Sequence, residues 1–347
     1  MHEFFPGANT PQGFFSYYQY ILPEAETNRK IILKGGPGTG KSSLMKKVAT
    51  LLRAKDCKVN LLHCSSDPDS LDAIVAPSLG FCMLDGTAPH IVDPITPGAA
   101  DTILHLGQYW DAAGIQRHKA EIRQISKEIS ACFANAYDYL SAAGSVQNYI
   151  RKEALKSADE TQITKALNAL MADLTLGADF HKPGKIKKAF LSGFTPKGNI
   201  SYIDSFVTAA DRVIQIKSEA DTATLFTNRL AERIVANGKD ATFFYCPLQP
   251  GKKIEHIYLP EEGIFITTSN MYHTCTTDAQ CINLNAFTMP YNALRADTDI
   301  LNILLSRAIS CIKQAKALHD KLEQFYIPYM DFDAMTDLPH KIVSEIL

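Results

Sequence analysis

Residues 35–42 read Gly-Gly-Pro-Gly-Thr-Gly-Lys-Ser, which fits the phosphate-loop pattern G-x-x-x-x-G-K-[ST]. The apolar run Ile31-Ile32-Leu33 stands directly before this motif, and residues 42–54 follow it with one apolar stripe at helical spacing. Glycines let a backbone wrap closely around phosphate oxygens, and the N-terminus of the next helix adds partial positive charge. Strand, loop and helix in this order predict a nucleoside triphosphate site, and a Gly-rich turn without a ligand is the weaker alternative.

The motif also assigns roles to side chains. Lys41 is expected to reach the β- and γ-phosphates, and the Ser42 hydroxyl to ligate Mg²⁺. Further strands are predicted over residues 58–63 and 80–84, and the second of these ends in Asp85, the place of a carboxylate that holds a water on Mg²⁺. The predicted nucleotide-binding residues are Gly35, Gly36, Pro37, Gly38, Thr39, Gly40, Lys41, Ser42 and Ser43, with Ser42 and Asp85 as magnesium ligands and Lys41, Asp85 and Asp67 as catalytic residues.

The second half of the chain is a diverged repeat of the first. Thr-Pro-x-Gly occurs at residues 10–13 and again at 195–198, and the run at residues 29–34 recurs at 212–217. A nearly constant offset between matching segments indicates duplication of one structural unit. We therefore predict two tandem α/β units of the P-loop NTPase type, each a parallel sheet flanked by helices and followed by a helical segment.

The two copies differ at the nucleotide site. Where the first has its phosphate loop, residues 218–224 contain no glycine, no lysine and two carboxylates, so the second loop is degenerate and one nucleotide per chain is expected. The acidic stretch 65–72 matches 247–254, which has no aspartate, and this joint loss suggests that Asp67, Asp69 or Asp72 serves the nucleotide. A turn and cap role for these aspartates is an equally good interpretation.

Features that survive in the degenerate copy are better explained by the fold. His90 matches His273, so we expect a structural role for it, and Cys64 matches Cys246 and is expected in the core. Asp85, in contrast, is replaced by Thr268.

Helical spacing of apolar residues extends over residues 101 to about 177 and again over 293–326, and we expect a helical hairpin in each segment. Packing between the two α/β units is the simpler role for these helices, and a lid or a partner-binding arm is the alternative. The basic Pro/Gly-containing stretch 182–188 is the predicted boundary, which divides the chain into residues 1–187 and 188–347.

Composition limits the other possibilities. The net charge of −2 makes nucleic acid an unlikely partner, and no apolar stretch has the length of a membrane span, so a cytoplasmic protein is expected. Eight cysteines without C-x-x-C spacing fit reduced thiols, and zinc on His273, Cys275 and Cys281 is a weaker alternative.

The runs at residues 33–42, 63–72 and 84–90 together resemble a family of tandem-repeat P-loop ATPases of Gram-positive bacteria. The resemblance covers most of the chain and implies ATP and Mg²⁺ as ligands and ATP hydrolysis as the activity, but it supplies no substrate. Relatives often carry a phosphate loop in both halves, so the degenerate second loop is a departure that argues against a symmetric two-site mechanism.

Three function classes fit these residues. The first is a Mg²⁺-dependent ATPase whose single site drives a rearrangement between the halves. Because Gly86 follows Asp85 where many hydrolysing relatives have glutamate, its base must lie elsewhere or turnover is slow. The second is a small-molecule or nucleotide kinase in which Asp67 orients the acceptor hydroxyl. The third is a nucleotide-gated module that binds a protein or small-molecule partner.

Overall fold

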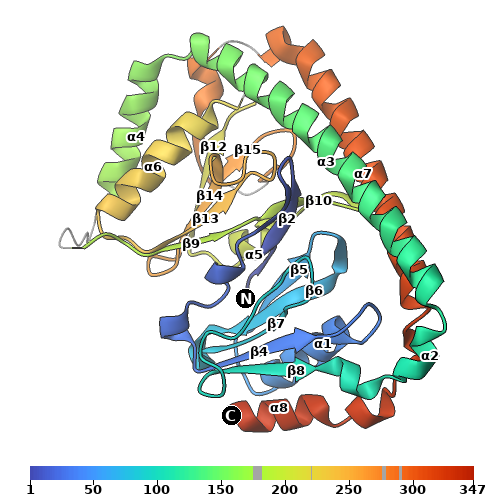
Figure 1. Ribbon diagram of the computed structural model, residues 1–347. Helices are drawn as coiled ribbons and strands as arrows, with labels where there is room; N and C mark the ends of the chain where they lie inside the picture. The colour runs from blue at the N-terminus through green and yellow to red at the C-terminus, as the bar shows by residue number, and fades with distance from the viewer. Residues whose placement is uncertain (175–181, 220, 276–278, 289–290) are drawn as a thin grey trace.

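The computed structural model describes residues 1–174, 182–219, 221–275, 279–288 and 291–347. Two six-stranded mixed sheets, each followed by helices, form two similar α/β units (Figure 1). The first sheet has the order β1, β5, β6, β7, β4, β8, and the second has the order β9, β13, β14, β15, β12, β16. The two orders match strand by strand, as the internal repeat in the sequence predicts.

The strands have these bounds. The first sheet contains β1 (Glu3–Phe4), β5 (Asn60–Cys64), β6 (Asp67–Ala76), β7 (Phe81–Asp85), β4 (Arg29–Lys34) and β8 (Asp101–His105). The second contains β9 (Ile186–Ala189), β13 (Ala241–Tyr245), β14 (Ile254–Leu259), β15 (Ile264–Ser269), β12 (Arg212–Lys217) and β16 (Gln280–Asn283). Two hairpins accompany the sheets: β2 (Gly7–Thr10) with β3 (Gly13–Ser16), and β10 (Ser192–Thr195) with β11 (Gly198–Ser201).

Neither sheet is purely parallel, which corrects the predicted parallel sheets. β6 runs antiparallel to both of its neighbours, and β14 does the same in the second unit. The stretch 65–72, expected to be a loop, is a short turn followed by the start of β6. A connection as short as this one can join only antiparallel strands, because a parallel pair needs a long crossover.

Each antiparallel strand carries a β-bulge at the same place. Along the β5–β6 pairing the register shifts so that Asp72 has no partner residue, and along the β13–β14 pairing the same shift leaves out Glu255. A bulge re-aims one side chain without ending the strand. The two repeats therefore present a carboxylate at equivalent bulges. Glu255 lies one residue beyond the stretch 247–254 that matches residues 65–72 in sequence.

Two helices contribute to the core of the first unit. α1 (Lys41–Arg53) covers one face of the first sheet, and α8 (Leu338–Ile346), from the end of the chain, packs on α1. Leu44, Val48 and Leu52 are buried along α1 because their spacing places them on a single face. The N-terminal segment around η1 (Tyr18–Tyr20) covers the other face of the sheet.

The second unit has its own apolar core. α6 (Ala223–Ala236) follows β12 as α1 follows β4, and α4 (Glu160–Leu174) packs beside α6. The short α5 (Ile203–Val207) contributes Phe206 to the opposite face of the second sheet. Phe5, Ala8 and Tyr17 from the start of the chain also lie in the core of the second unit, so this core is not built from the second repeat alone.

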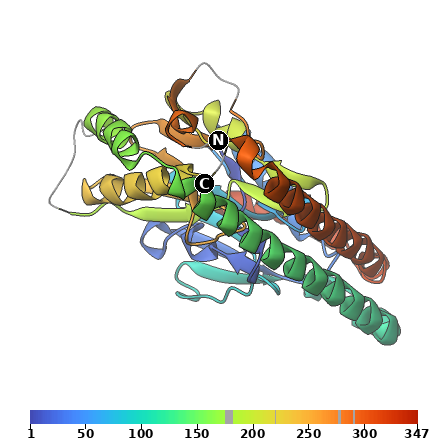
Figure 2. The same ribbon diagram turned by 90° about the horizontal axis from the view of Figure 1, so that it is seen from above.

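The long helices do not form one hairpin per repeat, as the sequence suggested. α3 (Lys119–Lys156), reached through the short α2 (Ala112–Gln116), instead packs along α7 (Arg295–Glu323) from the other repeat, and the two run side by side past both units (Figures 1 and 2). Small residues such as Ala136, Ala143 and Ala308 are fully buried between them and allow close approach. Among the described helices, none combines the length and the apolar character that a membrane-spanning segment requires.

The segment that joins the two halves is only partly described. The predicted boundary after residue 187 falls inside β9, whereas the expected end of the first helical segment near residue 177 lies outside the described residues. α7 ends against the first unit, so the second repeat contributes to the surroundings of the glycine-rich loop 35–42. The division at residues 187 and 188 stays a prediction about domains.

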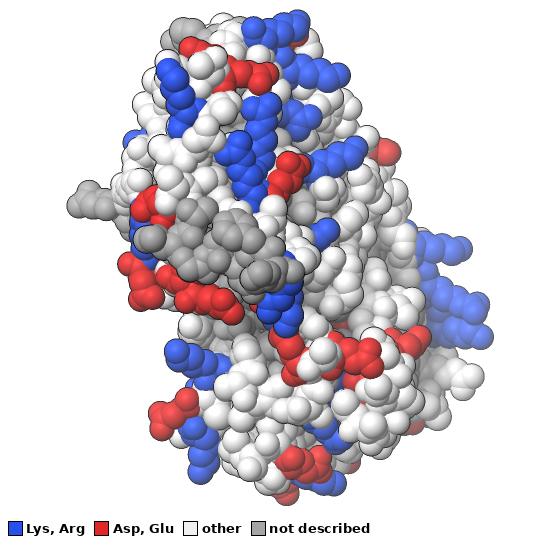
Figure 3. Space-filling view, turned by 90° about the vertical axis from the view of Figure 1, so that its left-hand side faces the viewer, with Lys and Arg blue, Asp and Glu red and all other residues white. Residues whose placement is uncertain are grey.

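Charges on the face shown in Figure 3 are mixed. Lys and Arg side chains gather over the second unit, with Asp and Glu among and below them. Ion pairs of the second unit include Arg229 with Glu160 at 3.1 Å and Arg212 with Asp173. Local pairing of this kind leaves no single-sign field across the face.

Candidate functional site

The predicted phosphate loop lies at the carboxyl end of β4, which is flanked by the parallel strands β7 and β8. The register pairs Leu33 with Asp85, so the carboxylate at the end of β7 lies next to the start of the loop. Gly38 and Gly40 have positive φ angles of 68° and 82°, which glycine adopts without steric cost. The sheet thus brings together the loop and Asp85, the predicted magnesium-site carboxylate.

Lys41 is held at the centre of this site. Its ammonium donates to the carbonyls of Gly35 and Gly36 at 2.9 Å each and lies 3.6 Å from Asp85 Oδ2. The side chains of Lys41 and Asp85 are only 14% and 16% exposed, so water screens their attraction weakly. Asp85 Oδ1 accepts from the backbone amide of Thr87 at 2.8 Å, which orients its carboxylate.

The hydroxyls of the loop have definite partners. Thr39 Oγ1 donates to Gly36 O at 2.8 Å, and Ser42 Oγ accepts from Leu71 N at 3.0 Å. The second contact joins the first turn of α1 to β6, next to the acidic start of that strand. Pro37 is partly buried in the loop and Ser43 is exposed on α1.

The three aspartates of the acidic stretch have different surroundings. Asp67 accepts from Ser70 Oγ at 2.9 Å and lies 3.2 Å from Lys316 of α7. Asp69 is exposed and pairs with Lys197, whose hydrogen bond lowers the pKa of Asp69. Asp72 is buried at its bulge, so the three side chains do not form one cluster.

A carboxylate from the far end of the chain contacts the phosphate loop. The Gly38 amide donates to Glu323 Oε1 at 3.2 Å, so an anionic oxygen lies against a loop amide. The segment after α7 covers the rest of the loop, because a Cβ at Gly36 would lie 3.0 Å from Tyr326 and one at Gly38 would lie 2.8 Å from Ile327. Sequence reasoning missed this contact, since nothing local connects residues 285 positions apart.

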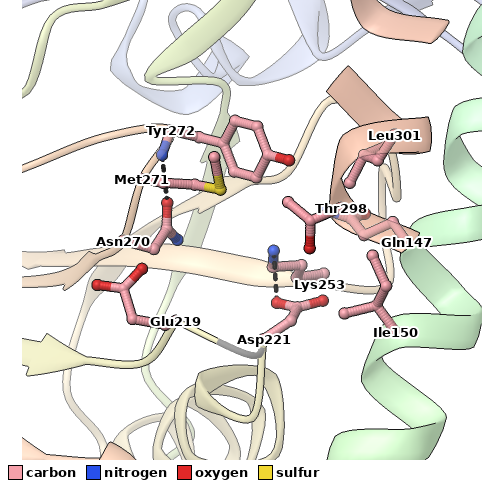
Figure 4. Close-up of a pocket in the computed structure, with 10 residues that line it drawn as sticks. All are labelled: Gln147, Ile150, Glu219, Asp221, Lys253, Asn270, Met271, Tyr272, Thr298 and Leu301. Atoms are coloured by element: carbon pink, nitrogen blue, oxygen red, sulfur yellow. Dashed lines mark hydrogen bonds and ion pairs between the residues drawn. The ribbon is translucent and has the colours of Figure 1, made fainter. Parts of the chain in front are cut away.

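In the second unit the degenerate loop contributes Asp221 to a buried group of charged side chains. Lys253 lies 2.6 Å from Asp221 and 3.1 Å from Glu255, and the side chains of all three are at most 11% exposed (Figure 4 shows the first pair). Burial lowers the pKa of Lys253, but the neighbouring carboxylates outweigh this and hold it well above its usual value. Burial likewise raises the pKa of Glu255, yet Lys253 and two histidines bring it down to about 2.

The cavity beside this ion pair is small. Its volume is about 30 Å³, and it is bounded by Lys253, Asp221 and residues of α3 and α7, including Gln147 and Thr298 (Figure 4). A cavity of this size holds about one or two water molecules and no nucleotide. Ala220 of the degenerate loop lies outside the described residues.

The weaker zinc alternative is not supported by the described residues. Around His273, the side chains that are close enough to share a metal are Glu255 and His256, whereas Cys281 is exposed on β16. His273 Nε2 is hydrogen-bonded to Thr268 Oγ1 at 2.8 Å, within the buried interior of the second unit.

Comparison with known proteins adds no family assignment to this geometry. No protein-family model, no curated protein and no solved structure matches the chain.

Proposed function

We propose that the protein is a Mg²⁺-dependent ATPase with a single nucleotide site in its first unit. The observation that carries the proposal is the convergence of Lys41 and Asp85 on one glycine-rich loop between β4 and α1. A lysine, a strand-end carboxylate and loop amides at a helix N-terminus are the elements that bind a polyphosphate and its cation. The resemblance to tandem-repeat P-loop ATPases supports the same proposal.

The side chains have distinct roles in this proposal. Lys41 now donates to loop carbonyls and is positioned to transfer its hydrogen bonds to phosphate oxygens. The Ser42 hydroxyl and the Asp85 carboxylate supply oxygen ligands of the kind that Mg²⁺ prefers, so the residues fit that ion. A bound magnesium ion neutralises charge on the phosphates. Gly35, Gly36, Pro37, Gly38, Thr39, Gly40 and Ser43 complete the proposed binding loop.

Glu323 adds a regulatory element to this site. Its carboxylate accepts from the Gly38 amide, which is one of the donors that a phosphate group requires. A triphosphate must therefore displace Glu323, and displacement of this residue moves the end of α7. Nucleotide binding in the first unit is in this way coupled to the helix that also borders the second unit.

Asp67 is the residue on which the kinase alternative depends. It lies at the start of β6, near the contact between Leu71 and Ser42, but its carboxylate is engaged by Lys316 and Ser70. Those contacts support a structural role as well as a catalytic one. We therefore keep hydrolysis as the proposed reaction and treat phosphoryl transfer as an outcome of the test.

The test combines calorimetric titration of Mg-ATP with steady-state phosphate release. We expect one nucleotide per chain, and we expect Lys41→Ala to remove most of the affinity while the fold is kept, because the lysine contributes charge rather than core packing. The matched control is Thr224→Ala, which changes the residue at the position of Lys41 in the second repeat. We expect this control to bind as the unchanged protein does.

Four results would contradict the proposal or a part of it. Unchanged affinity in a folded Lys41→Ala variant refutes the site, and a second nucleotide that persists in this variant refutes the single-site arrangement. Transfer of labelled phosphate to an added acceptor, in place of steady phosphate release, favours the kinase. Binding without either reaction favours a nucleotide-gated module.

A further inference from the structure

The two repeats share a group of buried or half-buried side chains that the proposed nucleotide site does not use. In the first unit it consists of Cys64 at the end of β5, Asp72 at the bulge of β6 and His90 after β7, with their ligand-type atoms within 4.8 Å of one another. Cys246, Glu255 and His273 are the counterparts in the second unit by sequence offset and strand register.

The first-unit group has unsatisfied polar atoms. Asp72 and His90 are 3% and 8% exposed, and within the described part of the chain Asp72 Oδ2 and His90 Nδ1 have no hydrogen-bond partner. Buried polar atoms without partners are rare, because losing their hydration costs free energy. A ligand bound to these polar atoms would replace the lost hydration and remove that cost.

The spacing of these atoms fits a shared metal ion better than a direct hydrogen bond. His90 Nε2 lies 3.6 Å from Asp72 Oδ1, which is too long for a hydrogen bond. Two ligands that bind one tetrahedral zinc ion, each at roughly 2.1 Å, are about 3.4 Å apart. Tyr18 stacks on the His90 ring at 5.2 Å between centroids and helps to hold the imidazole in place.

The second unit shows how the same charge is neutralised without a metal. There Lys253 places its ammonium 3.1 Å from Glu255, the counterpart of Asp72. By the strand register that matches Asp72 with Glu255, the residue that corresponds to Lys253 in the first unit is Ser70, which carries no charge. Asp72 thus lacks the cation that its counterpart has, and burial raises the pKa of its carboxyl, partly opposed by His90.

We propose that Cys64, Asp72 and His90 bind a zinc-class transition-metal ion whose place in the second unit is taken by the Lys253 ammonium. One thiolate sulfur, one imidazole nitrogen and one carboxylate oxygen suit Zn²⁺, whereas Mg²⁺ prefers oxygen ligands alone. Three protein ligands leave a fourth position for water or another group.

The position of this site connects it to the phosphate loop. Asp85 is close enough to Asp72 to affect the pKa of the Asp72 carboxyl. A metal ion at Asp72 would neutralise this carboxylate and weaken its repulsion of Asp85 at the end of β7. The site itself does not require nucleotide binding, so it can be tested whether or not the protein hydrolyses ATP.

The experiment uses the full chain and the metal alone as the probe. The protein is stripped with a chelator, reloaded with ZnCl₂, passed through a desalting column and analysed for metal by mass spectrometry. We expect about one zinc ion per chain. Loading with Co²⁺ is expected to produce the near-ultraviolet absorption of a thiolate bound to cobalt.

Matched variants locate the ion. Cys64→Ser, Asp72→Asn and His90→Gln are each expected to lose most of the retained zinc, and Cys64→Ser also to lose the thiolate absorption. The same changes in the second unit, Cys246→Ser, Glu255→Gln and His273→Gln, are expected to leave zinc retention unchanged in those variants that fold by circular dichroism.

Clear results contradict the proposal. Zinc retained at a substoichiometric background level by the unchanged protein refutes it, as does full retention in all three first-unit variants. Loss of zinc only in folded second-unit variants places the ion at Glu255, His256 and His273 instead. If first-unit variants do not fold, the cobalt spectrum of the unchanged protein decides, since absence of thiolate absorption excludes Cys64 as a ligand.

Discussion

Gly38 and Asp221 occupy the same position in the two repeats, and both have a left-handed backbone, with φ angles of 68° and 63°. Glycine adopts this conformation freely, whereas an aspartate in it costs on the order of 1 kcal/mol or more. In the second unit the Asp221 carboxylate contacts Lys253 at 2.6 Å, which offsets that cost. The left-handed backbone at this position is therefore shared by both repeats, although only the first has glycine there.

The first prediction concerns Glu323 as a competitor of the nucleotide. Removing its side chain by Glu323→Ala frees the Gly38 amide and removes a negative charge near the phosphates. We expect Mg-ATP to bind about tenfold more tightly, which corresponds to about 1.4 kcal/mol. Calorimetric titration measures this, with Glu345→Ala on the exposed part of α8 as the matched control. Equal affinities in the two variants would show that Glu323 does not compete.

The second prediction concerns Asp67 as a base. If its carboxylate orients the attacking water, Asp67→Asn lowers kcat by roughly a hundredfold and leaves ATP affinity almost unchanged. The control is Asp69→Asn, which changes an exposed neighbour that pairs with Lys197, and its turnover is expected to be kept. Full activity of Asp67→Asn together with a small loss of stability would assign Asp67 to the turn and direct the search for a base to α7.

The third prediction concerns the buried ion pair of the second unit. Lys253→Met leaves Asp221 and Glu255 without their cation, and uncompensated buried charges typically cost about 3–5 kcal/mol of unfolding free energy. Denaturant unfolding measures the loss. Lys252→Met makes the same substitution at the adjacent exposed residue and is expected to change stability by less than about 0.5 kcal/mol. Similar stabilities would mean that Lys253 is neutral in the folded protein.

The fourth prediction concerns pH. Burial holds the pKa of His256 well below 6.5, so the imidazole stays neutral in the folded protein while the unfolded chain takes up a proton. The free energy of unfolding should therefore be at its full value above pH 6.5 and fall progressively below it. His256→Gln is expected to reduce this dependence by up to about 1.4 kcal/mol per pH unit, the value for one proton.

The control for the pH dependence is His340→Gln, on the exposed surface of α8. We expect this variant to keep the pH profile of the unchanged protein in a series of thermal unfolding measurements. A His256→Gln variant whose stability has the same pH dependence as the unchanged protein would contradict the assignment of the proton to His256.

Much of the first unit could be predicted from local patterns. The strand β4, the phosphate loop and α1 follow from an apolar run, glycines and a helical stripe, all within 25 residues. β6 was missed because five of its first six residues are polar or proline, which hides the alternation of a strand. Glu255, the counterpart of Asp72 in the second unit, was missed because the position of the β-bulge, and not the sequence offset, shows which residue matches Asp72.

The sequence by itself indicated the repeat, a glycine-rich loop of the phosphate-loop pattern and the absence of that pattern from the second copy, because each depends on residue types at short spacings. Only the tertiary structure decided that α3 packs on α7, that Glu323 reaches the Gly38 amide, and that Asp72 and Glu255 occupy equivalent bulges. These relationships depend on burial and strand register between residues far apart in the chain, and neither composition nor periodicity carries that information.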